Sequence, residues 1–236
     1  MLLFDLVLPC YNPLPDWVDN LLASVASLQR ELPEAAPHVV LVNDGSAHGV
    51  EDAQIARLRV ALPHFTYVEH AQNQGKGQAL RTGVQHCQHA ICLFTDIDFP
   101  YEEASMARLY RVLAAGQTDV AAGSRDSDYY RQVPAARVAI SRTLRLVTRR
   151  LLRLPVSDTQ CGLKGFNARG KALFMRGQTR RYLFDLEFLY VSARQTGLRV
   201  RAVEVRLKPG VVFSKMPLRV LATESYSLLK ILWNVQ

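Results

Sequence analysis

The chain has 236 residues, of which 49% are hydrophobic and 21% charged, so it is long enough to bury a sizeable core in one domain. This excludes a short protein held together by disulfides. The 29 Lys and Arg residues outnumber the 21 Asp and Glu residues, and the net charge of +8 favours anionic partners such as nucleotides, phosphates, nucleic acid or acidic lipids.

Cysteine spacing and hydropathy indicate the compartment. The four cysteines form no CxxC pair and have no metal-ligand spacing, which predicts reduced thiols and no structural zinc site: Cys10, Cys87, Cys92 and Cys161. No apolar run reaches the roughly 18 residues of a membrane-spanning helix. The N-terminal apolar run is too short for a signal peptide and lacks a basic flank. The chain is therefore expected to be cytoplasmic.

Short strands alternate with helices in the first half of the chain. Apolar and β-branched runs predict strands at 3–9, 39–42, 65–68, 91–95 and 120–122. Apolar residues at helical spacing predict helices at 14–32, 50–62 and 76–88. A strand followed by a helix, four times over, predicts an α/β fold with a parallel sheet, helices on both faces and a ligand site at the carboxyl ends of the strands.

The second half has a different pattern. It predicts a basic helix at 135–152, a Gly-rich segment at 158–170, a helix at 183–195, a strand at 199–207 and a terminal helix at 217–234. No linker or repeat separates the halves, so residues 1–236 are expected to form one domain. The terminal helix, within an amphipathic segment 217–236, fits either a membrane surface or a packed core or dimer interface.

Two polar motifs follow a strand or open a helix. The NDGS motif at 43–46 places the carboxylate of Asp44 where it can accept hydrogen bonds from a ribose or base; a simple turn is the alternative. The NQGKG motif at 73–77 brings Lys76 and two glycines to a helix start, where they can approach an anion or only begin the helix. A P-loop and a GxGxxG fingerprint are absent, which counts against nucleotide hydrolysis and hydride transfer.

Charged residues also follow the fourth and fifth strands. Asp96 and Asp98 end the most apolar strand and offer the oxygen ligands that Mg²⁺ and Mn²⁺ prefer beside a diphosphate; solvated loop carboxylates are the alternative. Arg125 ends the fifth strand, and Arg137 and Ser141 share a face of the next helix, where both can face a phosphate. The basic face of that helix also fits anionic lipid or plain solvent.

Taken in chain order, the motifs resemble one family. LPCYNP, VNDGS, NQGKGQALRTG, DID, GSR, SDTQCGLKGF, FDLEFL and FSKM resemble family 2 glycosyltransferases of the GT-A fold, especially the dolichyl- or polyprenyl-phosphate mannosyl- and glucosyltransferases. The resemblance implies a Rossmann-like, mostly parallel sheet flanked by helices, with a nucleotide-binding half (1–123) and an acceptor and sugar half (124–216). It also implies inverting transfer of a hexose, with Mg²⁺ or Mn²⁺, from a UDP-glucose or GDP-mannose type of donor to a polyprenyl or dolichyl phosphate.

The resemblance further implies roles for single residues. It places the base and ribose on Pro9, Tyr11, Asn12 and Asp44, with Lys76 near the nucleotide and the metal on Asp96 and Asp98. It places acceptor or donor phosphate on Arg125, Arg137 and Ser141, the sugar on Asp158, Gln160 and Glu187, and a loop over the donor at Ser214 and Lys215. Catalysis is expected to depend on Asp98, Arg125, Asp158 and Glu187.

The sequence departs from the family pattern at three places. Family members often carry Glu at Pro13 and Asp at Asn43, which alters the expected base and ribose contacts. Mannosyltransferases of the family typically continue DxD with Leu-Gln, whereas Phe99 and Pro100 follow here and remove a metal ligand. This difference favours the glucosyl-type relatives or an unassigned branch.

The acceptor separates the main hypothesis from its rivals. A lipid phosphate is already an anion, so transfer to it needs positioning and charge neutralisation rather than a strong base. Transfer to a sugar hydroxyl would need a carboxylate base, from Asp158, Asp185 or Glu187. Asp185 and Glu187 lie on different faces of one predicted helix. Motif position favours Glu187, which leaves Asp185 to cap the helix or to pair with Arg180 or Arg181.

A rival of another class is a non-catalytic anion- or nucleic-acid-binding protein. It fits the net charge but not the motifs, so no nucleic-acid partner is expected. The expected partners are a nucleotide sugar, a lipid-phosphate acceptor and, through peripheral contact, the inner face of a membrane.

Overall fold

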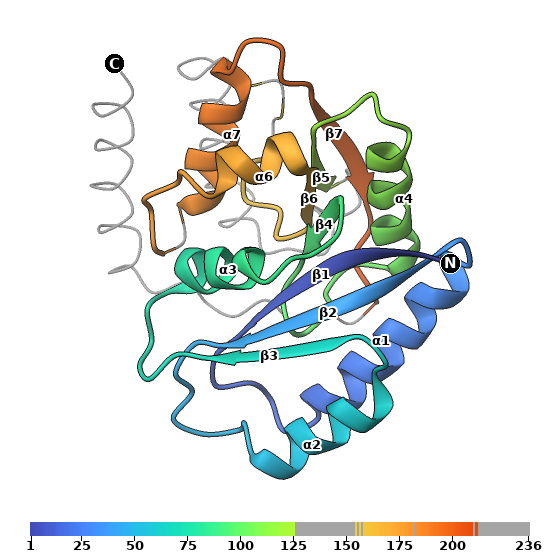
Figure 1. Cartoon of the computed structure of the whole chain (residues 1–236), viewed down its shortest axis with the longest axis vertical. Coiled ribbons are helices and arrows are strands. Elements are labelled where there is room, and N and C mark those ends of the chain that lie inside the picture. The colour runs from blue at the N-terminus through green and yellow to red at the C-terminus, as the bar shows by residue number, and fades with distance from the viewer. Residues whose placement is uncertain (126–153, 155, 157, 182, 210, 212–236) are drawn as a thin grey trace.

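Seven strands form one sheet in the order β3-β2-β1-β4-β6-β5-β7 (Figure 1). The computed structural model describes residues 1–125, 154, 156, 158–181, 183–209 and 211. The strands are β1 (Leu2–Cys10), β2 (Ala35–Asn43), β3 (Phe65–Glu69), β4 (Ile91–Phe94), β5 (Val120–Arg125), β6 (Lys164–Asn167) and β7 (Val200–Val205). Only β6 among them is antiparallel to its neighbours, β4 and β5. The α/β fold with a mostly parallel sheet, expected from the sequence, is confirmed.

Strand β6 is a strand that the sequence did not predict, and no residue range was predicted for the helices Glu103–Ala114 and Ala168–Phe174. The segment 158–170 was described only as Gly-rich, and it contains β6 and the start of a helix. The strand is only four residues long, KGFN, and it has a buried lysine and a glycine in place of β-branched residues. Its position between β4 and β5 supplies the hydrogen bonds that its sequence does not signal.

Six helices are described and cover both faces of the sheet (Figure 1). They are α1 (Trp17–Glu31), α2 (Asp52–Ala61), α3 (Lys76–Gln85), α4 (Glu103–Ala114), α6 (Ala168–Phe174) and α7 (Phe184–Arg194). One apolar cluster joins the sheet to α1, α2 and α4, and a second joins it to α3, α6 and α7. Both faces of the central strands are therefore buried, as is typical of parallel sheets.

Alternation along β1 shows how the two clusters share the sheet. Phe4, Leu6 and Leu8 belong to the first cluster, and Val7 belongs to the second. Successive side chains of a strand point to opposite faces, so an almost continuous apolar run is what a strand covered on both sides requires. Asp5 is the exception on the second face, because it is a fully buried carboxylate.

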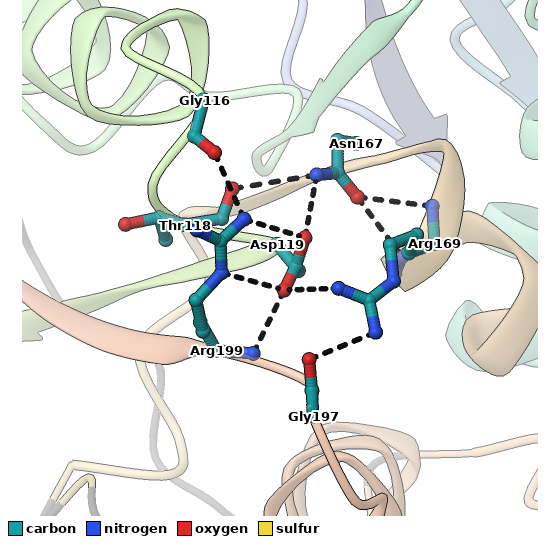
Figure 2. A network of polar contacts seen from close by, with 8 residues as sticks. Gly116, Thr118, Asp119, Asn167, Arg169, Gly197 and Arg199 are labelled. Atoms are coloured by element: carbon teal, nitrogen blue, oxygen red, sulfur yellow. Dashed lines mark hydrogen bonds and ion pairs between the residues drawn. The ribbon is translucent and has the colours of Figure 1, made fainter.

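A polar network fastens the start of β5 to its neighbours (Figure 2). The buried carboxylate of Asp119 accepts hydrogen bonds from Asn167 Nδ2 (2.9 Å) and from Arg199 N (2.8 Å) and Nε (3.2 Å), and it pairs with Arg169 Nη1 at 3.2 Å. Asn167 also caps α6, because its Oδ1 accepts from the backbone N–H groups of Arg169 and Gly170. One carboxylate thus connects β5, β6, α6 and β7.

Several sequence predictions lie outside the described residues, including the helices at 135–152 and 217–234. The division into a nucleotide-binding half and an acceptor half also stays a prediction. Within the described ranges, no helix combines the length and apolar character needed to cross a membrane.

Removing the charge of Asp119 should destabilise the protein. Burial alone would raise the pKa of Asp119, but hydrogen bonds from Arg199 and Asn167 outweigh burial and hold it well below its usual value. The stabilisation is therefore present above the unfolded-state pKa of about 3.9 and is lost as the pH falls through the folded-state pKa. Because the two arginines are about half exposed, Asp119→Asn should lower the free energy of unfolding by only about 2 kcal/mol at pH 7.

Urea unfolding measures this loss. Asp19→Asn is the matched control, since Asp19 forms an exposed pair with Arg57, and it should change the free energy of unfolding by less than about 0.5 kcal/mol. The difference between wild type and Asp119→Asn should shrink as the pH falls below about 4. Equal effects of the two substitutions at pH 7 would contradict the role of Asp119.

Candidate functional site

The polar motifs meet at the carboxyl ends of β1, β2, β4 and β5. β1 lies between β2 and β4, and only β6 separates β4 from β5. The loops that follow β1, β2 and β4 therefore lie along the same edge of the sheet as the carboxyl end of β5 (Figure 1). This is the edge at which α/β proteins bind ligands.

The loop after β1 is fastened to the loop after β2. Asn12 donates its backbone N–H to Ser46 Oγ (2.9 Å), and its Oδ1 accepts from the N–H of Ala47 (2.9 Å). Asn12 adopts a φ of +46°, a left-handed conformation that L-residues rarely adopt and that these contacts hold in place. Pro9 lies near the end of β1, and Tyr11 is 52% exposed, so its ring is available to stack on a flat ligand.

The carboxylate of Asp44 is buried and fully engaged. Oδ1 accepts from His70 Nδ1 (2.7 Å) and the Gln74 N–H (2.9 Å), while Oδ2 accepts from Asn73 Nδ2 (3.0 Å) and the Gly75 N–H (2.9 Å). A carboxylate has about four acceptor positions, and all four are occupied. Asp44 therefore fixes the loop that leads into α3 and does not present a free oxygen at the edge of the sheet.

The two DxD carboxylates lie beside a lysine from α3. Lys76 Nζ forms an ion pair with Asp96. Burial alone would lower the pKa of Lys76, but the negative charges of Asp96 and Asp185 outweigh it and raise that pKa. Desolvation and the charge of Asp96 raise the pKa of Asp98. A divalent cation would relieve this repulsion between carboxylates, so the donor set fits Mg²⁺ or Mn²⁺.

A glycine lets the segment before β6 approach Asp96 closely. A Cβ atom on Gly162 would lie 2.5 Å from Asp96 Oδ2 and 3.8 Å from Lys76 Nζ. The N–H of Gly162 donates to Tyr101 Oη at 3.0 Å, which fixes the segment in this position. The segment 158–163 thus forms one wall of the acidic site.

Backbone strain also concentrates at this edge of the sheet. Phe99, directly after the DxD pair, has a φ of +46°. Asn12 and Phe99 are the two non-glycine residues with positive φ in the described ranges. The Phe99 side chain is 1% exposed, so an apolar ring is buried where the mannosyltransferase pattern has Leu-Gln. Strained residues of this kind are common at functional sites, where the surrounding contacts hold them.

Arg125 and Asp158 form a bidentate ion pair. Arg125 Nε and Nη2 lie 2.6 and 2.7 Å from Asp158 Oδ2 and Oδ1, and the N–H of Arg125 donates to Oδ2 at 3.1 Å. Burial would lower the pKa of Arg125, but the hydrogen bonds and charge of Asp158 outweigh burial and raise it. The structure therefore brings together two residues that the sequence analysis assigned to phosphate and to sugar.

Asp185 and Glu187 diverge, as their spacing predicted. Asp185 is buried and pairs with Lys164 Nζ at 2.6 Å, so the expected pairing with Arg180 or Arg181 is replaced by an ion pair to β6. Burial raises the pKa of Asp185, while the charges of Lys164 and Lys76 oppose that rise. This coupling places Asp185 on the side of the acidic site.

Glu187 faces a different part of the chain. Its carboxylate accepts hydrogen bonds from the N–H groups of Gln178 (3.0 Å) and Thr179 (2.8 Å). These contacts hold the turn between α6 and α7. Motif position favoured Glu187 over Asp185 as the group that faces the pocket, whereas Asp185 is the carboxylate that couples electrostatically to Lys76 and Asp96.

Two buried polar atoms near the acidic site have no hydrogen-bond partner within the described part of the chain. They are Thr95 Oγ1, next to Asp96, and Gln160 Nε2, two residues before Gly162. An unmade buried hydrogen bond costs about 1–3 kcal/mol, so both atoms are suited to contact a bound ligand. Gln160 was a predicted sugar-pocket residue; Thr95, Tyr101, Gly162 and Lys164 were missed.

The missed residues carried weak sequence signals. Tyr101 and Lys164 act through partners far away in the chain, and no local pattern reports such contacts. Gly162 stands inside a motif that the sequence analysis quoted, but its close approach to Asp96 depends on the position of β6. Four other predicted site residues lie outside the described residues: Arg137, Ser141, Ser214 and Lys215.

Comparison with known sequences gives a consistent group of relatives. The model of the family described as "Glycosyl transferase family 2" matches residues 5–174. Glycosyltransferase AglD of Haloferax volcanii is 28% identical over 208 residues, which cover 87% of this chain and 33% of that protein. The dolichyl-phosphate beta-glucosyltransferases of Drosophila melanogaster and Saccharomyces cerevisiae are 28% and 25% identical, over 80% and 81% of this chain. The chain spans only 62% and 63% of those two relatives.

Solved structures share the fold. Mannosyl-3-phosphoglycerate synthase from Rubrobacter xylanophilus superposes with a TM-score of 0.66 at 14% identity, over 99% of this chain and 73% of that one. Glucosyl-3-phosphoglycerate synthase from Mycobacterium tuberculosis, in complex with Mn²⁺, UDP and glucosyl-3-phosphoglycerate, gives 0.63 at 15% identity, over 99% and 79%. These similarities show the architecture alone.

If Asp44 fixes the 70–75 loop, its removal should destabilise the fold. Asp44→Ala leaves the ring N–H of His70 and the backbone N–H groups of Gln74 and Gly75 without their acceptor, and it should lower the free energy of unfolding by about 3 kcal/mol. Urea unfolding measures the change. Asp16→Ala serves as the control, because Asp16 is exposed and makes no side-chain cap bond to α1. An Asp44→Ala variant as stable as wild type would show that the carboxylate is not a structural anchor.

Proposed function

We propose that this chain, which belongs to glycosyl transferase family 2, transfers a hexose from a nucleotide sugar to a polyprenyl or dolichyl phosphate. The observation that carries the proposal is the convergence of Asp96, Asp98 and Lys76 at the carboxyl end of β4, against Gly162. Two repelling carboxylates beside a lysine suit a metal-bound diphosphate, since the cation and the ammonium group together balance its charge.

Asp96 and Asp98 would hold Mg²⁺ or Mn²⁺, and the ion would supply positive charge to the departing nucleoside diphosphate. Lys76 lies where its ammonium group can contact the same diphosphate. Tyr11 offers an exposed ring for the base, and Asp44 keeps the loop before Lys76 in place. These contacts position the donor at the edge of the sheet.

On the acceptor side, Arg125 supplies a fixed guanidinium group at the end of β5. Its pairing with Asp158 keeps it oriented, and Gln160 Nε2 is a buried donor that is suited to a sugar hydroxyl. An acceptor phosphate is already charged at neutral pH, so the protein needs to hold it in line with the anomeric carbon rather than remove a proton. The family resemblance implies inversion at that carbon.

A UDP-glucose type of donor is favoured over GDP-mannose. The named dolichyl-phosphate relatives are beta-glucosyltransferases, and the solved glucosyl-3-phosphoglycerate synthase holds UDP. Phe99 and Pro100 stand where the mannosyltransferase pattern has Leu-Gln, and Phe99 is buried. A dolichyl or polyprenyl phosphate acceptor lies in a bilayer, so we also propose peripheral contact with a membrane surface, consistent with the net charge of +8.

Asp185 favours a second candidate function, transfer to a hydroxyl acceptor. Asp185 is buried, its pKa is raised by burial, and it couples to Lys76 and Asp96. A carboxylate with a raised pKa in such a place can serve as a general base for a hydroxyl group. Its ion pair with Lys164 makes a structural role the simpler assignment, so the lipid-phosphate acceptor is preferred.

A transfer assay tests the proposal. The full chain is incubated with radiolabelled UDP-glucose or GDP-mannose, Mn²⁺, and either dolichyl phosphate or 3-phosphoglycerate as the hydroxyl acceptor. We expect labelled lipid from UDP-glucose and dolichyl phosphate. Gly162→Ala should lower kcat/KM by about 100-fold, because the added Cβ displaces the Asp96 carboxylate.

Unfolding measurements separate this effect from loss of structure. Gly162→Ala should leave the urea midpoint nearly unchanged, since only the end of the Asp96 side chain has to move. Asp19→Asn, remote and exposed, should keep wild-type activity. Label in the 3-phosphoglycerate product alone would favour the hydroxyl acceptor, and full activity in Gly162→Ala would contradict the placement of the acidic site.

A further inference from the structure

Three side chains meet on one face of the sheet, away from the acidic site. Asp5 lies near the start of β1, His38 near the start of β2, and His89 two residues before β4. Asp5 is five residues from the end of β1, which at about 3.3 Å per residue places it about 16 Å from the carboxyl edge. Neither the expected transfer reaction nor any sequence motif uses these residues.

The Nδ1 atoms of the two histidines contact the same oxygen of the Asp5 carboxylate. His38 Nδ1 lies 2.8 Å from Asp5 Oδ1, and His89 Nδ1 lies 2.9 Å from the same oxygen. One ligand atom from each residue lies within 4.8 Å of the other two. The two imidazole rings are nearly perpendicular, with centroids 5.5 Å apart. Two ring nitrogens and one carboxylate oxygen are therefore close enough together to share one ion.

Outer contacts hold these groups in orientation. His89 donates its backbone N–H to Asp5 Oδ2 at 2.7 Å, and His38 Nε2 lies 2.9 Å from Thr66 Oγ1. A threonine hydroxyl accepts as well as donates, so it can hold the tautomer of His38 with the proton on Nε2. In that tautomer Nδ1 carries a lone pair that can bind an ion in place of the hydrogen bond to Asp5. A metal-ligating histidine typically donates its other ring N–H in this way.

Burial differs among the three residues in a way that suits an ion. The side chains of Asp5 and His38 are 0% and 7% exposed, whereas that of His89 is 23% exposed. A buried carboxylate is costly unless positive charge or hydrogen bonds balance it. The partial exposure of His89 keeps one of the three ligands in contact with solvent, from which an ion can arrive.

We propose that Asp5, His38 and His89 form a site for a zinc-like divalent ion, separate from the Asp96–Asp98 site. Imidazole nitrogens suit Zn²⁺, whereas Mg²⁺ prefers the all-oxygen environment of the acidic pair. Zn²⁺ bonds of about 2.0–2.1 Å in a tetrahedron need ligand atoms about 3.3 Å apart, so the two N–O distances would open by about 0.4 Å. The bound ion would join the amino ends of β1 and β2 to the segment before β4.

Zinc titration of the full chain tests the site. Asp96→Asn and Asp98→Asn are introduced to remove the acidic pair, metal is stripped with a chelator, and Zn²⁺ or Mg²⁺ is titrated against a chromophoric chelator. We expect one Zn²⁺ per chain and no competition from Mg²⁺. Adding His89→Ala should weaken Zn²⁺ binding by at least about 100-fold, since loss of a ligand exceeds the effect of losing an outer contact.

His86→Ala is the matched control. His86 is an exposed neighbour on the same segment, bonded through Nδ1 to the carbonyl of Thr82, and its removal should leave Zn²⁺ affinity unchanged. X-ray absorption of the zinc-loaded protein should show only nitrogen and oxygen ligands, a readout that needs no variant. Absence of Zn²⁺ binding would mean that the three residues form a hydrogen-bonded group only and would overturn the proposal.

Zinc binding by the neighbouring thiols would also contradict the proposal. Cys87 and Cys92 have their Sγ atoms 3.5 Å apart, and Cys92 is the strand partner of Asp5. Sulfur ligands near 2.3 Å in the absorption spectrum would assign the ion to these thiols. Zinc binding that persists in His89→Ala but is lost in Cys87→Ser with Cys92→Ser would do the same. This test does not use the transfer assay, so a negative result in the transfer assay would not change the conclusion about zinc binding.

Discussion

The buried ion pair between Lys164 and Asp185 joins the late part of the chain to the sheet. Lys164 is completely buried, so its ammonium group needs the carboxylate of Asp185 and the carbonyl of Cys161 as partners. This requirement fixes α7 against β6 and fixes the segment before β6 across the carboxyl ends of the strands. The contact of Gly162 with Asp96 and the pairing of Asp158 with Arg125 both follow from that placement.

The charged side chains at this edge of the sheet suit a cation and a diphosphate that bind together. Asp96, Asp98 and Asp185 place negative charge near Lys76, and burial together with the charge of Asp96 raises the pKa of Asp98. A cation and a diphosphate arriving together bring opposite charges and satisfy both halves of the site. The same logic explains why Asp44 is sequestered: its four hydrogen bonds stiffen the loop before Lys76, so that less ordering remains for the ligand to impose.

Much of the first half was predictable, because most strands and helices there carry their own pattern, although no residue range was predicted for α4. The strands near 3–9, 39–42 and 65–68 are confirmed, and the motifs that follow the strands lie together as parallel topology requires. Strand β6 was not predictable, because its sequence KGFN has no strand pattern. These residues form a strand through their pairing with β4 and β5. The partners of Asp44 and Asp185 were also hidden, since contacts 21 to 31 residues apart leave no local signal. The roles assigned to single site residues stay predictions.

Anomalous diffraction from crystals soaked with Mn²⁺ and UDP tests whether Asp96 and Asp98 hold the metal, because it locates the metal without reference to activity. We expect one manganese peak within about 2.0–2.4 Å of carboxylate oxygens of both Asp96 and Asp98, with the diphosphate on the same ion and near Lys76. A diphosphate bound at this edge without a metal, or a manganese peak that contacts neither carboxylate, would contradict this expectation.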